Sequence, residues 1–346
     1  MAKILYGVAG EGSGHSSRAK EIIDYLESKR HTVKVVSYGK GYQNLQPCFN
    51  VERIFGLHFS YENNEIKYLP TVIKNLSKLS EAAKSIDKVS QIVQEFKPQI
   101  IFSDFEPISS IVANIKKIPL ISIDNQHRLT NTKIQYPKKY GKSAFVAKAI
   151  TNLMVFNPKA YLVTAFAESG VTDKKTFLFP PILRKEVLQA KTKQGDYVLV
   201  YLTSQFQELA DTLKNIDEKF VIYGFDRNTK EKNLIYKKVS QKGFLKDLVN
   251  CKAVIANAGF SLITESMHLG KPYLALPVAG QFEQVLNAVQ LVKLGYGQYY
   301  DKLNKDKIVD FLHHFEQYRK NLEQYKREDN SKIFAKIDEL IKEYAI

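Results

Sequence analysis

The sequence contains no tryptophan and only two cysteines among its 346 residues. Cys48 and Cys251 stand far apart and show none of the spacings of a zinc site, so we expect buried thiols in a reducing cytosol and no disulfide framework. No apolar run is long enough to cross a bilayer, and a strand pattern begins at once, at Lys3, which predicts no signal peptide. These absences predict a cytoplasmic globular protein.

Acidic residues are the scarcer charge: 36 Asp and Glu stand against 51 Lys and Arg, for a formal net charge of +15. A field of this sign attracts phosphates, anionic lipids or nucleic acids without choosing among them, and a lysine-rich solvated surface explains it equally well. A nucleic-acid partner would rest on this charge alone, so we expect none.

One segment, Asn125 to Ala167, has no acidic residue at all. Its positive charges are Arg128, Lys133, Lys138, Lys139, Lys142, Lys148 and Lys159. Aromatic and aliphatic residues interleave with them, which suits a protein that lies on an anionic membrane surface. An amphipathic helix whose apolar face belongs to the core fits the same pattern, and both interpretations stay open.

Length and hydrophobic patterning predict an α/β protein with two domains. The chain is long for a single core, and short apolar strands alternate with helical patterns, as in parallel sheets covered by helices. Two prolines in Phe177–Arg184 indicate an extended connector. We therefore expect Rossmann-like domains at 1–181 and 182–325. A last helix at 326–346 either crosses back to the first domain or belongs to the second.

The first strand, Lys3–Ala9, runs into a glycine-rich loop, Gly10–Ser17. Such loops let the backbone approach a ligand closely. A dinucleotide site fails, because His15 stands where helix packing needs a third glycine and the second strand ends without the acid that holds a ribose. An imidazole at the mouth of a strand suits a general base, with Glu11 as rival or auxiliary. A histidine that only positions the loop is the alternative.

Two further strand patterns end in polar residues. Asp104 follows Gln99–Ser103, and the cluster Asp124, Asn125, Gln126 and His127 follows Leu120–Ile123. Because the carboxyl ends of parallel strands meet at one edge, Asp104 is expected near His15, where it would orient the imidazole or hold a hydroxyl. Capping of the next helix is the alternative. The cluster from Asp124 is a candidate acceptor contact.

The stretch 256–297 contains two successive strand–loop–helix patterns. The first strand ends in Asn257-Ala258-Gly259, and Ser261 is a candidate N-cap of the helix that follows. The second strand leads into the polar loop Gly280–Gln284. This arrangement predicts an anion-binding helix end and a group of sugar-sized hydrogen bonders at one sheet edge.

The same stretch resembles the donor-binding half of GT-B glycosyltransferases, which have two facing Rossmann-like domains with a cleft between them. It is most similar to the group that contains the N-acetylglucosaminyltransferase of peptidoglycan lipid assembly and the galactolipid synthases. The shared residues are Ala258, Gly259, Thr264, Glu265, Gly270, Pro272, Pro277, Gln284, Asn287 and Ala288. The resemblance implies that Glu265 holds the ribose of a nucleotide sugar. It assigns the sugar hydroxyls to Glu283 and Gln284, with Gln281 beside them.

Other parts of the chain extend this resemblance. The first loop is similar to the family's Gly-x-Gly-His, which implies that His15 is the base for the acceptor's proton and places Gly14 at the donor. By the same resemblance Arg184 reaches the diphosphate. Phe244 and Leu245 match a segment whose backbone recognises the base. Thr203 and Ser204 replace the usual glycine-rich phosphate loop, a departure that leaves their hydroxyls or amides as phosphate ligands.

The resemblance implies a metal-independent, inverting glycosyltransferase that carries a sugar from a nucleotide diphosphate, most simply UDP, to a lipid or glycan hydroxyl. The leaving diphosphate would be stabilised by backbone N–H groups around Ala258, Gly259 and Phe260, at the start of the helix that holds Ser261. No Asp-x-Asp motif is present to hold a metal, and no cofactor is implied. An epimerase or hydrolase on the same fold, or a non-catalytic nucleotide-sugar-binding protein, is the alternative.

Overall fold

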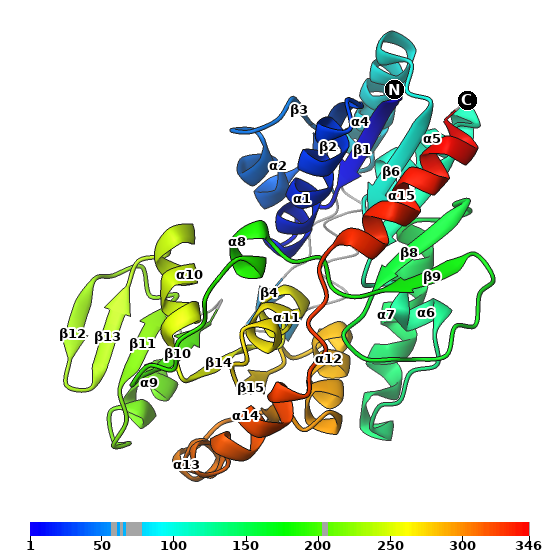
Figure 1. Cartoon of the computed structure of the whole chain (residues 1–346). Helices are drawn as coiled ribbons and strands as arrows, with labels where there is room; N and C mark the ends of the chain where they lie inside the picture. Colours follow the sequence, from blue (N-terminus) through cyan, green and yellow to red (C-terminus); the bar gives the residue numbers. More distant parts are fainter. Residues whose placement is uncertain (57–60, 63–64, 67–77, 203–206, 346) are drawn as a thin grey trace. The chain divides into compact units, whose positions relative to one another are not determined.

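The computed structural model describes residues 1–56, 61–62, 65–66, 78–202 and 207–345. Contacts within the chain divide it into two compact units (Figure 1). The first unit comprises Met1–Arg184 and Glu328–Ile346, and the second comprises Lys185–Arg327. The second unit is therefore inserted, in sequence, into the first.

The first unit is built on a seven-stranded sheet in the order β3-β2-β1-β6-β7-β8-β9, and every neighbouring pair in it is parallel. Its strands are β1 (Lys3–Val8), β2 (Thr32–Ser37), β3 (Val51–Arg53), β6 (Ile100–Asp104), β7 (Leu120–Asp124), β8 (Ala160–Thr164) and β9 (Thr176–Phe179). A separate antiparallel pair consists of β4 (Tyr61–Glu62) and β5 (Glu65–Ile66). β6 and β7 are buried along their whole length, because helices cover both faces of the sheet.

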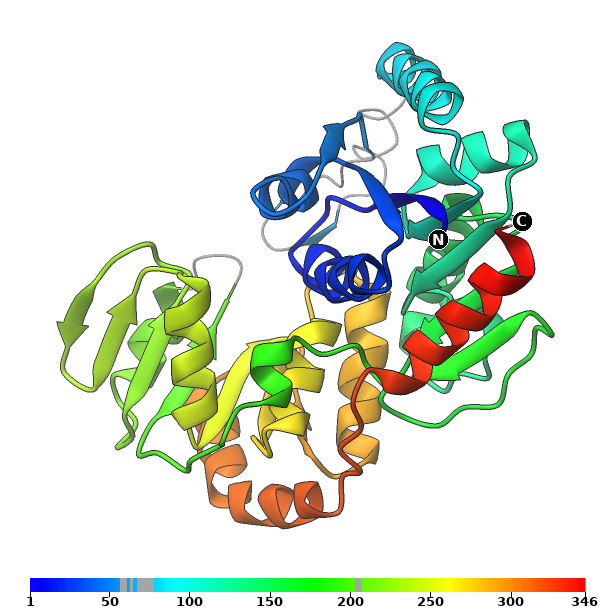
Figure 2. The same ribbon diagram turned by 45° about the horizontal axis from the view of Figure 1, so that its top comes forward.

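Helices pack on each face of this sheet around a separate apolar core. The helices among the described residues of the unit are α1 (Gly14–Ser28), α2 (Gly39–Leu45), α4 (Leu79–Phe96), α5 (Pro107–Lys116), α6 (Arg128–Asn131), the 3-10 turn η1 (Lys138–Tyr140), α7 (Gly141–Met154) and α15 (Ser331–Tyr344). Residues of α1 and α15 share one core with the sheet, and residues of α4 and α5 share the other. Figures 1 and 2 both show α15, in red, lying along the first unit's sheet.

The second unit repeats the same plan. Its sheet has the order β12-β13-β11-β10-β14-β15-β16, parallel except for the pair β12–β13. The strands are β10 (Val198–Tyr201), β11 (Phe220–Tyr223), β12 (Thr229–Glu231), β13 (Leu234–Lys237), β14 (Ala253–Asn257), β15 (Tyr273–Leu276) and β16 (Gly297–Tyr299). The helices are α8 (Lys185–Leu188), α9 (Gln207–Leu213), α10 (Gln241–Asn250), α11 (Phe260–His268), α12 (Phe282–Lys293), α13 (Lys305–His313) and α14 (Phe315–Glu323). The predicted α/β class with two parallel sheets is confirmed.

Candidate functional site

In both sheets the strand order reverses beside the first strand of the unit. β1 lies between β2 and β6, and β10 lies between β11 and β14. Loops that leave neighbouring strands in opposite directions open a space at the carboxyl edge, which is where open α/β sheets bind ligands. The glycine-rich loop follows β1 and Asp104 ends β6, so the first candidate site lies at this switch point. The turn after β14 holds the equivalent place in the second unit.

His15, Asp104 and Arg18 meet at the first switch point. The Nδ1 atom of His15 lies 2.7 Å from Oδ1 of Asp104. Arg18 donates to both oxygens of the same carboxylate, from Nε at 2.8 Å and from Nη2 at 2.5 Å. Asp104 is fully buried and Arg18 is nearly so, whereas the His15 side chain keeps 12% of its surface exposed. The buried carboxylate of Asp104 thus contacts both His15 and Arg18, and of these three side chains only His15 reaches the surface.

These distances decide which nitrogen of His15 carries the proton. A carboxylate paired with arginine is ionised and can only accept, so the 2.7 Å contact requires a proton on Nδ1. The Arg18 Nη2 atom, 3.2 Å from the same nitrogen, then makes no hydrogen bond to it. The lone pair of Nε2 is left to accept a proton. Burial opposes the charge on Arg18, but Asp104 outweighs it and raises the pKa of Arg18 above its ordinary value.

A second histidine–aspartate pair closes the end of β7. His127 Nδ1 lies 2.6 Å from Oδ2 of Asp124, and the backbone N–H of His127 donates to Oδ1 at 2.8 Å. Both side chains are 1% exposed. Burial opposes ionisation of Asp124, but His127 and the hydroxyl of Ser122 lower the pKa of Asp124 to about 2. Within the described part of the chain, Nε2 of His127 is buried without a hydrogen-bond partner.

Phe105 and Asn125 connect the two pairs. The ring of Phe105 stacks on His15, with centroids 6.3 Å apart, and meets His127 edge-on at 6.2 Å. Phe105 has φ +56, a left-handed conformation that a bulky residue adopts only when its surroundings impose it. Asn125 accepts from Nη1 of Arg18 at 2.9 Å. Of the predicted catalytic and acceptor residues, His15 and Asp104 are therefore connected through Phe105 and Arg18 to His127 and Asn125.

The helix after β6 is capped by Glu106 and not by Asp104, the alternative that the sequence left open. The carboxylate of Glu106 accepts from the backbone N–H groups of Ile108 at 2.8 Å and Ser109 at 2.6 Å. Burial raises the pKa of Glu106 to about 6, against these hydrogen bonds. Asp104 is consequently left for His15 and Arg18. Of the other predicted residues in the first loop, Glu11 is partly exposed and Gly14 begins α1.

The turn after β14 differs from the prediction at the helix start. Gly259, not Ser261, is the N-cap of α11, and no side chain caps that end. Ser261 lies inside the first turn because the helix already begins at Phe260. The turn is braced from two sides: Asn287 donates to the Ala258 carbonyl at 3.1 Å, and Tyr273 donates to the Asn257 carbonyl at 2.6 Å. These two hydrogen bonds fix the turn and hold the first backbone N–H groups of α11 beside Gly259.

The remaining predicted donor residues lie at several places in the second unit. Glu265 is buried on α11, 6% exposed. At the start of α12, Gln284 accepts from the backbone N–H of Val278 at 3.0 Å and donates to the side chain of Gln281, while Glu283 occupies the first turn of the helix.

Three further predictions concern the connector, the phosphate loop and the base. Arg184 ends the first segment of the first unit. Thr203 and Ser204 lie outside the described residues. Phe244 and Leu245 lie within α10, where the Phe244 N–H donates to the Ser240 carbonyl at 2.9 Å. The recognition of a base by this segment stays a prediction.

Arg18 is the residue that sequence reasoning missed. It follows His15 by three positions, so both side chains leave α1 on one face. This three-residue spacing was the signal in the sequence that could have placed Arg18 beside His15. Across the described ranges, no group of three His, Cys, Asp or Glu side chains is placed to hold a metal ion. No helix in the described part of the chain is long and apolar enough to cross a membrane.

Solved structures of several glycosyltransferases superpose on this chain. The glycotransferase of kitacinnamycin superposes with a TM-score of 0.73 at 15% identity, covering 98% of each chain. A glycosyltransferase of Phytolacca americana, solved with UDP-2-fluoro-glucose and pterostilbene, has a TM-score of 0.69 at 13% identity, covering 99% of each chain. The fold is thus that of the GT-B glycosyltransferases.

The sequence comparisons identify the family. The model of glycosyl transferase family 1 matches residues 2–316, and the chain belongs to this family. An uncharacterized glycosyltransferase of Methanosarcina acetivorans is 24% identical over 338 residues, which cover 86% of this chain and 85% of the relative. The protein is therefore an enzyme of the glycosyltransferase class, as the sequence predicted. Its predicted place beside the peptidoglycan and galactolipid enzymes stays a prediction.

Proposed function

We propose that the protein is a metal-independent, inverting glycosyltransferase that moves a sugar from a nucleotide-diphosphate donor to a hydroxyl of a lipid or glycan acceptor. The observation that carries the proposal is the contact of His15 with Asp104 at a strand edge, 2.7 Å long and partly open to the surface. Membership of a glycosyltransferase family supplies the reaction class. The residues supply the proton transfer that the reaction needs.

In the proposed mechanism, Nε2 of His15 takes the proton of the acceptor hydroxyl as its oxygen bonds to the anomeric carbon. The bond from that carbon to the donor's phosphate oxygen breaks, and the nucleoside diphosphate leaves. Asp104 fixes the imidazole's tautomer and stabilises the imidazolium that forms. Arg18 holds the Asp104 carboxylate in place through two hydrogen bonds. Direct displacement by the acceptor inverts the configuration at the anomeric carbon.

The donor is assigned to the second unit. The N-terminal end of α11, which begins at Phe260 after the N-cap Gly259 and has no side-chain cap, presents backbone N–H groups and the positive end of the helix dipole to a diphosphate. A Cβ atom added at Gly259 would meet no atom of the described residues within 4 Å, apart from its own chain neighbours. Glu265 is proposed for the ribose and Gln281, Glu283 and Gln284 for the sugar. The Phytolacca enzyme's complex with UDP-2-fluoro-glucose supports a UDP-sugar.

Association with an anionic membrane surface is the part of the proposal that concerns a lipid acceptor. Helix α7 exposes an apolar stripe, with Phe145 and Leu153 each 76% exposed and Phe156, just beyond it, 40% exposed. Lys142 and Lys148 lie on the same helix, within the segment that has no acidic residue. Exposed apolar rings beside lysines favour the interface of an anionic bilayer.

The donor is tested by a thermal-shift screen of the protein against UDP-, GDP-, dTDP- and CMP-sugars, because a ligand that binds only the folded state raises the Tm. We expect UDP-sugars to give the largest shift. Product analysis with and without lipid and glycan acceptor pools then separates the reactions. Epimerised or hydrolysed donor in the absence of acceptor, or tight UDP binding with no turnover on any acceptor, would contradict the transferase proposal.

A further inference from the structure

Phe105 stands in a strained turn next to the candidate base. It follows Asp104 at the end of β6 and precedes Glu106, the cap of α5, and its φ is +56. A β-carbon makes this left-handed conformation unfavourable, so it persists only where the surroundings impose it. Strain of this kind gathers at functional sites, which makes Phe105 a candidate for a role in this one.

Hydrogen bonds on both sides of Phe105 impose its conformation. The hydroxyl of Ser103 accepts from the Glu106 N–H at 3.0 Å and donates to the Glu106 carbonyl at 2.8 Å, which closes a turn from Ser103 to Glu106. The carbonyl of Asp104 accepts from the N–H of Ala9 at 3.0 Å. Ser103, Asp104 and Glu106 are fully buried, so water cannot replace these bonds. The turn therefore fixes the direction in which the Phe105 side chain leaves the backbone.

The ring of Phe105 contacts both histidines of the site. It is nearly parallel to the His15 ring, with an angle of 11° between the planes and centroids 6.3 Å apart. It meets the His127 ring edge-on, with centroids 6.2 Å apart. His127 is itself fixed by two hydrogen bonds to Asp124. Phe105 thus touches one imidazole that is fixed and one that reaches the surface.

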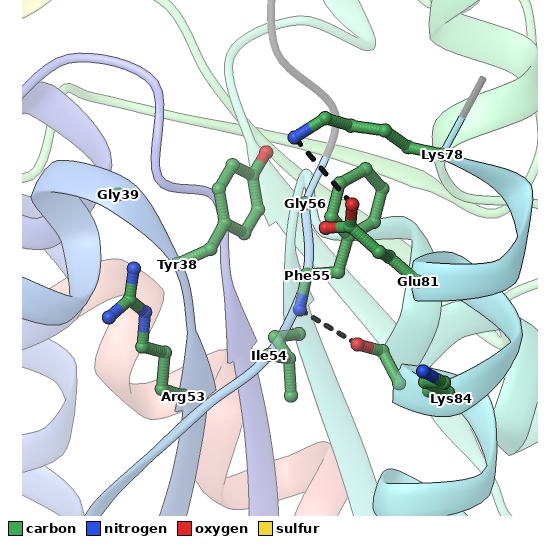
Figure 3. A pocket seen from close by; sticks show the side chains of 10 residues that line it. Tyr38, Gly39, Arg53, Ile54, Phe55, Gly56, Lys78, Glu81 and Lys84 are labelled. Atoms are coloured by element: carbon green, nitrogen blue, oxygen red, sulfur yellow. Dashed lines mark hydrogen bonds and ion pairs between the residues drawn. The ribbon is translucent and has the colours of Figure 1, made fainter. Parts of the chain in front are cut away.

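The packing around Phe105 holds its ring beside His15. Phe105 belongs to the apolar core on the α4 and α5 side of the sheet, together with Tyr38 and Ile54. Those two residues also line a cavity of about 400 Å³, and Figure 3 shows the Tyr38 ring at its wall. Phe105 is not among the described residues that line this cavity, and it is 9% exposed. The cavity therefore gives the Phe105 ring no space into which it can turn.

The direction of the His15 ring depends on more than its hydrogen bond. The contacts of His15 with Asp104, at 2.7 Å, and with Arg18, at 3.2 Å, are both made at Nδ1. An imidazole turns about two side-chain torsions, so contacts at one atom do not fix the direction of the opposite nitrogen. The Phe105 ring lies parallel to the imidazole in an offset stack, and this contact restricts the rotation that remains.

We propose that Phe105 is a positioning residue for the transfer reaction, whose ring holds the plane of the His15 imidazole so that Nε2 points at the acceptor hydroxyl. This inference rests on the proposed function, in which Nε2 removes the acceptor's proton. The strained turn brings the ring to this place, because a different φ would redirect the bond from Cα to Cβ. Misplacing a reacting group by about 1 Å can cost about 100-fold in rate.

Steady-state kinetics of Phe105→Leu test the proposal, since this variant keeps an apolar side chain and loses the ring. We expect kcat to fall about 10- to 100-fold. KM for the donor should not change, because the donor is assigned to the second unit. The matched variant Phe96→Leu removes a ring that packs against the same core from α4, and it should keep the wild-type kcat. Wild-type kcat in Phe105→Leu, or equal falls in both variants, overturns the proposal.

The motion of the His15 ring gives a readout that needs no activity. Relaxation of histidine labelled with ¹³C at Cε1 reports the amplitude of ring motion, and the His15 signal is the one that is absent in His15→Ala. The amplitude should rise in Phe105→Leu and stay unchanged in Phe96→Leu. Ser103→Ala opens the turn without removing the ring and should raise the amplitude to a smaller extent, and it serves the same test if Phe105→Leu does not fold. An amplitude equal to wild type in these variants overturns the proposal.

The activity of His15→Ala separates this proposal from the proposed function. If His15→Ala transfers sugar at the wild-type rate, His15 is not the base and both proposals fail. If His15→Ala loses activity while Phe105→Leu keeps the wild-type kcat, the proposed function stands and only the role of Phe105 is overturned.

Discussion

The two histidine–aspartate pairs of the first unit have the same chemistry in different settings. Each aspartate ends a buried parallel strand, and each holds an imidazole nitrogen within 2.7 Å. His127 comes from the turn directly after its aspartate, whereas His15 comes from a helix 89 residues earlier in the chain. The first pair includes a buried arginine and keeps its imidazole partly exposed. The second is sealed, with both side chains 1% exposed.

From this difference we expect the first pair to exchange a proton with a substrate and the second to act mainly on the stability of the fold. A general base must reach the proton that it removes. Only His15 meets this condition at the surface, and Arg18 secures the ionised aspartate behind it. His127 is fixed by two hydrogen bonds to Asp124, and its other nitrogen is buried. Although both pairs consist of a histidine and an aspartate, we therefore expect mutations in the two pairs to have unequal effects.

The largest expected effect is on kcat. His15→Ala should lower kcat roughly 10²- to 10⁴-fold, the contribution of a general base, with little change in donor binding. His127→Asn should lower kcat less than about tenfold and act mainly on stability. Steady-state kinetics with the donor and acceptor found in the screen measure both. Full activity in His15→Ala, or equal losses in the two variants, would remove the distinction between the pairs.

The next largest effect, on the free energy of unfolding, is expected for Arg18, which has no counterpart in the second pair. Arg18→Met should lower the free energy of unfolding by about 3–5 kcal/mol, because Asp104 is left buried without its cation. Lys20→Met, on the exposed side of the same helix, breaks the surface pair with Asp24 and should cost less than about 1 kcal/mol. Urea unfolding monitored by circular dichroism compares them. Similar losses in both variants would show that Asp104 does not depend on Arg18.

A pH series examines the second pair, formed by His127 and Asp124. The pKa of Asp124 is about 2 in the folded chain against an ordinary value of 3.8, so the folded state favours its ionised form. The resulting stability, about 2 kcal/mol, is present above roughly pH 4 and is lost as the pH falls toward 2. Urea unfolding from pH 2 to 5 should therefore show a shallower pH dependence in Asp124→Asn than in wild type. Parallel curves for the two proteins would contradict this assignment.

The smallest effect is expected from the hydroxyl that supports the sealed pair. Ser122→Ala removes one hydrogen bond, 2.6 Å long, to Asp124 and should cost about 1 kcal/mol, since the two contacts from His127 remain. Kcat should not change. Thermal unfolding and the same kinetic assay give the two readouts. A large fall in kcat would mean that the second pair takes part in catalysis after all.

The sequence predicted the elements and the strand-end residues of the site better than its supporting contacts. Apolar strands with polar residues directly behind them are local patterns, and parallel pairing brings their ends together. This reasoning placed Asp104 near His15 correctly. It missed Arg18, because a basic residue inside a helical pattern looks like a solvated one until the strand that faces it is known.

Helix starts and the cavity show the same limit. Ser261 has the composition of an N-cap, but the turn braced by Asn287 and Tyr273 makes the helix begin earlier, at Phe260. Asp104 and Glu106 are both acids before a helix, and only the fold decides which one caps it. No sequence motif marks the cavity lined by Tyr38, Arg53, Phe55 and Lys78 (Figure 3), because its walls come from three separated stretches of the chain.

The return of the chain to the first unit has a consequence for biosynthesis. Ile333, Ile337, Leu340 and Ile341 of α15 complete a core that also contains Ile4 and Ile22, and Asn330 is bonded twice to the backbone of Leu183, at 3.0 and 2.8 Å. A ribosome delivers the inserted unit in full before it delivers this helix. The second unit can therefore fold while the first unit still lacks α15 and exposes the apolar face that this helix covers. Nascent chains halted before residue 331 should engage chaperones through that face, and release of the last helix should end the dependence.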